Sequence, residues 1–185
     1  MPDQPFLTDI KTIRERARRD IEEGAVTANY GADKATVLKL LNESLATEIV
    51  CTLRYRRHYF MAKGLAASGA AEEFLEHAKA EQEHADQFAE RIVQLGGEPD
   101  FNPEGLATRS HAEYVEGESL IDMIREDLIA ERIAIESYRD IIRYLGEGDP
   151  TTRKLFESVL AVEEEHADDM LSLIENVSRQ HGGVA

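Results

Sequence analysis

Apolar and polar residues follow a helical period in four long segments of the chain. In each segment a stripe of residues recurs at alternating steps of three and four, which places the side chains on one face of an α-helix. The segments span about residues 33–63, 69–95, 117–145 and 150–179. Gly64, Gly96 and Gly146 stand just past helix ends, and Asp149-Pro150 is typical of a helix start. The pattern predicts four helices whose apolar stripes meet in a bundle.

The connections between these segments differ in length. Residues 64–69 and 146–149 are short links, so the first and second helices should be antiparallel, as should the third and fourth. The middle link is long enough, at roughly 3.3 Å per residue, to run the full length of a bundle. We therefore expect an all-α fold of two antiparallel hairpins joined by a long crossover. It should occupy residues 31–180, with an N-terminal extension at 1–30 and a short tail at 181–185.

Six polar side chains interrupt the apolar stripes at positions that face the predicted core. They are one glutamate on each of the first and third helices and a Glu-x-x-His pair on each of the second and fourth: Glu48, Glu81, His84, Glu131, Glu163 and His166. The two pairs lie in similar segments, AEQEHADQF at 80–88 and VEEEHADDM at 162–170, about 82 residues apart. The chain therefore looks like a duplicated helical hairpin.

Carboxylates on an apolar seam repel one another and are costly to bury unless cations neutralise them. No lysine shares these stripes, and Arg91 lies at the far end of its own. A glutamate and a histidine three residues apart stand one above the other on a helix, so each pair can bind one metal ion. Glu83 and Glu165 are rotated by about 100° from the pairs and should point elsewhere.

One Glu-x-x-His pair is a weak signal, because a solvated acidic helix face contains the same spacing by chance. Two pairs with matched partner glutamates, all on seam positions, instead predict a site for two divalent cations. Oxygen and imidazole ligands together suit iron or manganese.

Residues 33–179 resemble bacterioferritin-type ferritins of the ferritin-like superfamily. The matching segments are NESLATEIVCTLRYRRHYF, AKAEQEHADQFAERIVQLGGEPD, DLIAERIAIESYRDII and LAVEEEHADDM. The resemblance implies a ferritin-like four-helix bundle and ferroxidase chemistry, in which two Fe(II) ions are oxidised by O2 or H2O2 and ferric mineral collects inside a protein shell. It implies two iron ions in the site, with manganese or zinc as substitutes. Its ligand assignment is terminal Glu48 and Glu131, bridging Glu81 and Glu163, and one histidine per iron, His84 and His166.

The sequence departs from the family pattern in three places. Bacterioferritins bind haem through a methionine just after the bridging glutamate of the second helix; here that position is Gln82, so we expect no haem. The family's inner-surface iron site uses a histidine and an aspartate where this chain has Glu76 and Ala80, which puts that iron route in doubt. The family's fifth helix has no counterpart after Arg179. These departures suit a smaller, Dps-like shell, so a homo-oligomer of twelve chains is slightly favoured over one of twenty-four.

Several further residues are candidates for supporting roles. The resemblance places Tyr55 near the two irons, where it would donate an electron or orient a ligand, unless it is a plain buried tyrosine. Asp127 lies one turn before Glu131 and would hydrogen-bond a ligand histidine. His77 lies one turn before Glu81 on the same face. It either lies beside the metal ligands on the entry path of the ions, or is a partly exposed histidine of the inward-facing stripe. The remaining histidines follow no pattern: His58, His111 and His181.

Composition restricts the partners. The formal net charge of -16 disfavours nucleic acid and anionic membranes and attracts cations. No apolar run approaches the roughly 20 residues of a membrane span, and MPDQPFLTDIK lacks an apolar signal core, so we expect a cytoplasmic protein. Cys51 is the single cysteine and cannot form an internal disulfide; its simplest role is that of a small buried apolar residue.

The segment TDIKTIRERARRDIEEG, residues 8–24, is predicted to form an amphipathic helix with Ile10, Ile13, Ala17 and Ile21 on one face. Its basic residues suggest a DNA-binding arm, but its acidic residues balance them one for one, so phosphate binding should be weak. Docking on a neighbouring subunit is the favoured interpretation.

Three functions are compatible with these patterns. The first is an iron-oxidising and iron-storing shell. The second is a di-metal oxidoreductase without storage, such as a peroxide-consuming or manganese catalase-like enzyme with the same ligands. The third is a metal-free helical interaction module, which the carboxylates on the seam disfavour.

Overall fold

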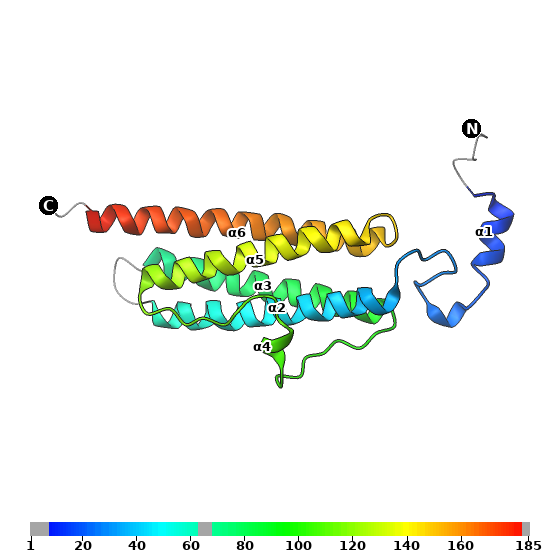
Figure 1. Cartoon of the computed structure of the whole chain (residues 1–185), viewed down its shortest axis with the longest axis horizontal. Coiled ribbons are helices and arrows are strands. Elements are labelled where there is room, and N and C mark those ends of the chain that lie inside the picture. Colours follow the sequence, from blue (N-terminus) through cyan, green and yellow to red (C-terminus); the bar gives the residue numbers. More distant parts are fainter. Residues whose placement is uncertain (1–7, 63–67, 183–185) are drawn as a thin grey trace.

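The computed structural model describes residues 8–62 and 68–182, without the side chains of residues 68 and 180–182. Gly64, the side chain of His181 and residues 183–185 of the predicted tail lie outside that description. The elements are α1 (Ile10–Arg16), a 3-10 turn η1 (Ile21–Glu23), α2 (Lys34–Met61), α3 (Ser68–Gln94), α4 (Leu106–Arg109), α5 (Leu120–Leu145) and α6 (Pro150–Gly182). The predicted all-α four-helix bundle is confirmed, and α2, α3, α5 and α6 are its four helices (Figure 1). None of the described helices is long and apolar enough to cross a membrane.

Local sequence determines where the long helices begin. Asp33 is the N-cap of α2, and its side chain accepts a hydrogen bond from the backbone of Thr36. Helix α5 starts at Leu120, three residues later than its periodicity predicts. Gly117 has a φ of 68°, a left-handed conformation that suits glycine, and Ser119 then caps the helix.

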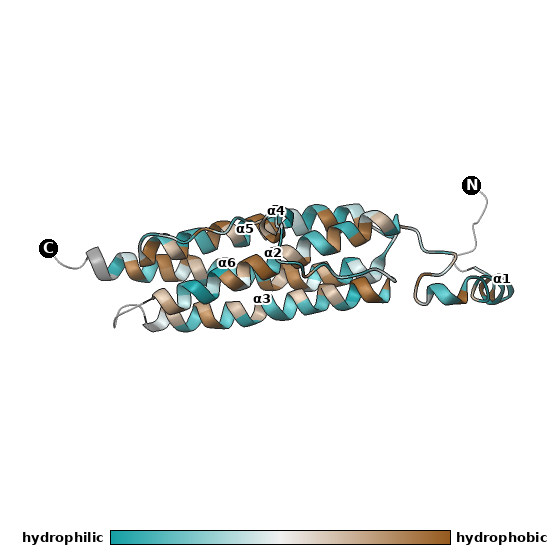
Figure 2. Ribbon diagram, turned by 90° about the horizontal axis from the view of Figure 1, so that it is seen from below, coloured by the Kyte–Doolittle hydropathy of each residue, from teal (hydrophilic) through white to brown (hydrophobic). Residues whose placement is uncertain are grey.

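Two apolar clusters fill the bundle on either side of a polar layer. One cluster joins the first half of α2, the second half of α3, the second half of α5 and the first half of α6, with Leu41, Phe88, Tyr138 and Phe156 among its buried members. The other joins the opposite halves. All four long helices alternate apolar and polar positions along their length (Figure 2). The layer between the clusters contains the six polar seam residues, so the apolar packing holds the four helices around them.

The crossover between α3 and α5 runs along α2, and side chains of α2 hold it in place (Figure 1). Asn42 accepts a hydrogen bond from the backbone of Asp100 at 2.7 Å. Thr47 Oγ1 accepts one from the backbone of His111 at 2.9 Å. Further along, Arg54 donates to the carbonyl oxygen of Glu113 at 2.8 Å. The crossover is therefore fixed at several points and covers one flank of the bundle.

The N-terminal segment is less helical than its pattern predicts. Helix α1 ends at Arg16, and η1 follows only after a break in which Asp20 adopts a left-handed φ of 47°. Neither element buries a residue, and the side chains of Ile10 and Ile21 are 60% and 70% exposed. A short helix that contacts none of the apolar clusters of the described residues gains little in water, which accounts for its early end. Tyr30 connects the segment to the bundle by a 2.8 Å hydrogen bond to Asp149.

Candidate metal centre

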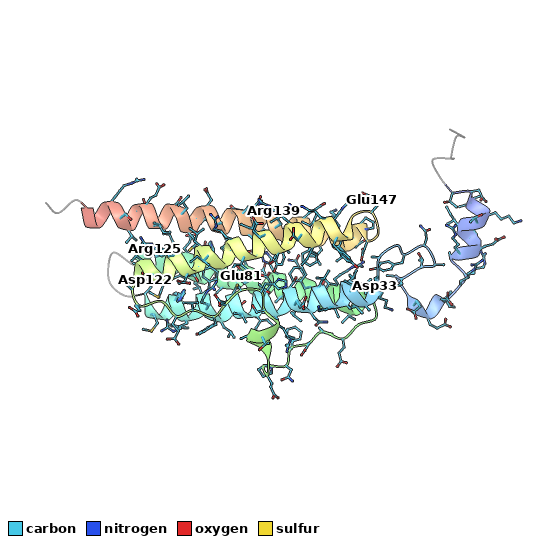
Figure 3. The ribbon with its side chains drawn as sticks, viewed as in Figure 1. Asp33, Glu81, Asp122, Arg125, Arg139 and Glu147 are labelled. Carbon is cyan, nitrogen blue, oxygen red and sulfur yellow. The ribbon has the colours of Figure 1, made fainter. Side chains whose placement is uncertain are left out.

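The six polar seam residues meet between the four long helices, at the boundary of the two apolar clusters. Every one of them is at most 5% exposed: Glu48, Glu81, His84, Glu131, Glu163 and His166. Figure 3 shows Glu81 midway along the bundle. Glu83 and Glu165 are exposed, as their rotation around the helices predicts.

The six side chains divide into two overlapping groups, each of which could hold one metal ion. The ligand atoms of each group lie within 4.8 Å of one another. The first group consists of Glu48, Glu81, His84 and Glu163, and the second of Glu81, Glu131, Glu163 and His166. Glu81 and Glu163 belong to both groups. The arrangement thus offers two candidate metal positions that share a pair of carboxylates.

Each histidine faces the shared carboxylates. His84 Nδ1 lies 2.9 Å from Glu163 Oε1 and 3.8 Å from Glu81 Oε2. His166 Nδ1 lies 3.2 Å from Glu81 Oε1 and 3.5 Å from Glu163 Oε2. Both imidazoles therefore present the same nitrogen to the centre of the layer.

Burial and mutual repulsion destabilise the charged forms of the two unshared carboxylates. Burial, followed by the charges of Glu163 and Glu81, raises the pKa of Glu48 well above its ordinary value. Burial and the same two neighbours raise the pKa of Glu131. Burial opposes the charge on His166, but hydrogen bonds to Glu163 and Glu81 outweigh it and raise its pKa to about 9.

Several buried ligand atoms have no hydrogen-bond partner with suitable geometry among the described residues. They are one oxygen of Glu48, both oxygens of Glu163 and Nδ1 of His84. Such orphaned atoms are rare in protein interiors and call for an unseen partner. When both histidines bind metal as neutral imidazoles, the four carboxylates carry four negative charges, which two divalent cations would balance. The residues present therefore fit a pair of metal ions.

Two tyrosines hold the two unshared glutamates. Tyr55 donates a short hydrogen bond to Glu131, and Tyr138 donates one to Glu48. Both tyrosines are fully buried. The family resemblance places Tyr55 near the irons but assigns no role to Tyr138, although Tyr138 lies seven residues after Glu131 just as Tyr55 lies seven after Glu48.

Asp127 is buried beside the centre, but the expectation that it would hydrogen-bond a ligand histidine is wrong. Its Oδ1 accepts from Arg54 Nε at 2.8 Å, and its Oδ2 lies 2.8 Å from His58 Nδ1. His58 also faces the carbonyl oxygen of Glu116 at 3.0 Å. The physical reason is a buried cation that was not among the predicted inward-facing residues. Arg54 is 1% exposed and attracts the carboxylate of Asp127.

Arg54 and His58 were both missed from the sequence. They lie three and seven residues after Cys51, which is also buried, so the three share a second inward stripe of α2. That stripe was the available signal. Cys51 itself packs with Ala112 and Ala130, as expected for a small apolar residue.

His77 is buried rather than partly exposed, with 3% of its surface accessible. Its ring stacks on that of His166, with centroids 3.9 Å apart, and its Nδ1 lies 3.3 Å from the Tyr55 hydroxyl. Burial, and then the charge of His166, lowers the pKa of His77 to about 3, so its imidazole is neutral.

Known proteins with this fold share the sequence pattern over most of the chain. The bacterioferritin of Desulfovibrio desulfuricans is 30% identical over 145 residues, which make up 78% of this chain and 75% of the relative. Its structure, solved with the diiron site in different catalytic states, has a TM-score of 0.70 at 28% identity and covers 79% of this chain and 82% of its own. A dodecameric thioferritin, the bacterioferritin-related protein of Bacteroides fragilis, has a TM-score of 0.79 at 26% identity and covers 83% and 93%.

The family model for a ferritin-like domain matches residues 38–180, which include all four long helices but for the first residues of α2 and the last of α6. The matched range contains every residue of the polar layer. The chain belongs to the ferritin-like family.

Proposed function

We propose that the protein oxidises Fe(II) at a di-metal carboxylate site and stores the product as ferric mineral. One observation carries the proposal: two groups of buried ligands share Glu81 and Glu163, and several of their ligand atoms have no hydrogen-bond partner among the described residues. Fe(II) is here the substrate. Two ions that share carboxylates would each give up one electron, and the two electrons, together with two protons from solvent, would reduce O2 to H2O2 or H2O2 to two molecules of water.

The chain's own residues would divide this work. Glu81 and Glu163 would hold both ions, while Glu48 with His84 and Glu131 with His166 would complete one position each. Tyr55 and Tyr138 would orient the unshared glutamates through the hydrogen bonds that they donate. The apolar clusters on both sides would keep bulk water from the layer. Manganese and zinc suit the same ligands, and Gln82, exposed on α3, offers no haem ligand.

We further propose that the chains form a closed homo-oligomeric shell, with twelve chains slightly favoured over twenty-four. The thioferritin of Bacteroides fragilis is described as a dodecamer. Apolar side chains of α1 and η1 that touch no core residue, Ile10, Ile13 and Ile21, would contact a neighbouring copy. A net charge of -16 per chain suits a container that must attract cations.

Iron loading combined with light scattering tests the storage function. We expect a particle of about twelve chains that retains many more than two iron ions per chain after Fe(II) and an oxidant are added. A di-metal oxidoreductase without storage has the same ligands but would form a small oligomer that retains about two metal ions per chain. A monomer or dimer at micromolar concentration, with and without iron, would rule out the shell and favour that enzyme.

A further inference from the structure

A second group of metal-ligand side chains lies beside the polar layer and includes none of its six residues. Glu73 and His77 come from α3, and Asp169 comes from α6. His77 Nε2 lies 3.5 Å from Asp169 Oδ2 and 3.6 Å from Glu73 Oε1. One ligand atom from each of the three residues lies within 4.8 Å of the other two, a spacing that could hold an ion.

The position of the His77 ring is fixed from two sides. It stacks on His166, and the ring of Tyr55 meets it edge-on with centroids 5.2 Å apart. Its Nε2 is therefore aimed between the two carboxylates. Both distances exceed the 2.7–3.2 Å of a good N–H···O hydrogen bond. The nitrogen thus faces a gap between two carboxylate oxygens and forms no close hydrogen bond with either of them.

The two carboxylates can be reached from solvent, and among the described residues neither forms an ion pair with a lysine or an arginine. The side chains of Glu73 and Asp169 are 32% and 42% exposed. Burial, and then the charge of Asp169, raises the pKa of Glu73. Burial, and then Glu165, raises the pKa of Asp169. Each carboxylate is thus partly dehydrated and repelled by acidic neighbours, an environment that a divalent ion would relieve.

His77 connects this outer group with the inner ones. Its second possible group is formed with Glu131 and His166, again with ligand atoms within 4.8 Å. Glu131 and His166 in turn belong to one of the two groups of the polar layer. Neighbouring groups therefore share residues all the way from the surface to the shared carboxylates.

The duplication of the hairpin provides an internal comparison. At a spacing of 82 residues, the positions matching Glu73 and His77 are Leu155 and Val159, and the position matching Asp169 is Gln87. Val159 is buried in an apolar cluster, against which Leu155 packs. The repeated Glu-x-x-His pattern alone therefore does not produce the group of Glu73, His77 and Asp169. Among the described residues the group occurs on one side of the polar layer and has no counterpart at the duplicated positions.

We propose that Glu73, His77 and Asp169 form a third divalent-cation site, which passes ions inward through His77 to the position formed by Glu131 and His166. Binding at this site stands on its own geometry. Its role as the uptake route rests on the proposed function of the polar layer.

Cobalt(II) binding, followed by calorimetry and by visible absorbance, counts the sites without an activity assay. We expect two tight sites and one weaker site per chain. The double variant Glu73→Gln/Asp169→Asn should weaken the third site by roughly tenfold or more and leave the tight pair unchanged. The matched control is Glu72→Gln/Asp168→Asn, which removes the same charge from exposed neighbours on the same helices and should leave all three sites intact.

Two results would overturn the third site: wild-type protein that binds only two ions, or a third site that survives the double variant. If instead the tight pair is absent while the variant removes the remaining site, the proposed function fails and the third site stands. Stopped-flow Fe(II) oxidation then tests the uptake role. The variant should raise the Fe(II) concentration for half-maximal rate several-fold, by analogy with other groups that support a metal site, and leave the maximal rate unchanged. Equal curves for variant and control would exclude this route.

Discussion

Replacing Glu81 with alanine is expected to slow Fe(II) oxidation by about 100-fold or more, because residues that merely support a metal ligand already contribute 10–100-fold. Glu81 belongs to both ligand groups, and its Oε1 lies 3.2 Å from His166 Nδ1. Its loss would remove one of the two carboxylates that hold the ions together, so electrons could no longer leave as a pair. Stopped-flow absorbance of ferric species after mixing with O2 or H2O2 measures the rate.

The matched control is Glu83→Ala, which removes the same side chain two residues later on α3. Glu83 is exposed and points away from the centre. Its replacement should leave the oxidation rate within about twofold of wild type, as is usual for surface substitutions away from a site. Equal rates in both variants and wild type would disprove the assigned centre.

Replacing Arg54 with methionine is expected to lower the free energy of unfolding by about 3–5 kcal/mol, because it leaves Asp127 buried without its guanidinium partner. Arg54 and Asp127 are 1% and 0% exposed and are joined by a 2.8 Å hydrogen bond. The guanidinium also donates to Glu113 in the crossover. Urea denaturation of metal-free protein, followed by circular dichroism, measures the loss.

Two further variants separate the buried charge from other effects of this substitution. Arg56→Met removes an exposed arginine from the same helix and should change stability by less than about 0.5 kcal/mol. Arg54→Met combined with Asp127→Leu should recover much of the loss, because neither buried charge then remains. If the double variant is no more stable than Arg54→Met, packing rather than charge explains the effect.

The bundle and its polar layer could be predicted because both depend on local spacing. A helical stripe determines which residues face inward, and an inward glutamate is conspicuous on any stripe. The positions of Glu48 and Glu131 followed from that pattern alone, and the structure brings both to the same layer as the two Glu-x-x-His pairs.

The surroundings of the layer could not be predicted in the same way, because they depend on which helices become neighbours. Asp127 has two inward partners across the bundle, and only the packing of α2 against α5 selects Arg54 and His58. Likewise, His77 is buried because the ring of His166 on α6 covers it. The early end of α1 reflects missing contacts, about which amphipathic periodicity carries no information.

The crossover network is one-sided, and this makes the two halves of the duplicated hairpin unequal. At the duplicate spacing of 83 residues, Ser137 and Ile141 occupy the places of Arg54 and His58, and Ser44 that of Asp127. The candidate ligand group with Glu131 and His166 therefore adjoins His77 and the side of the layer that holds Arg54, whereas the group with Glu48 and His84 lies against an apolar cluster. If ions enter past His77, an ion can reach the position of Glu48 and His84 only through the position of Glu131 and His166. An ion bound by Glu48 and His84 would then be the last to leave. Two positions with the same kinds of ligand would then bind and release their ions in a fixed order.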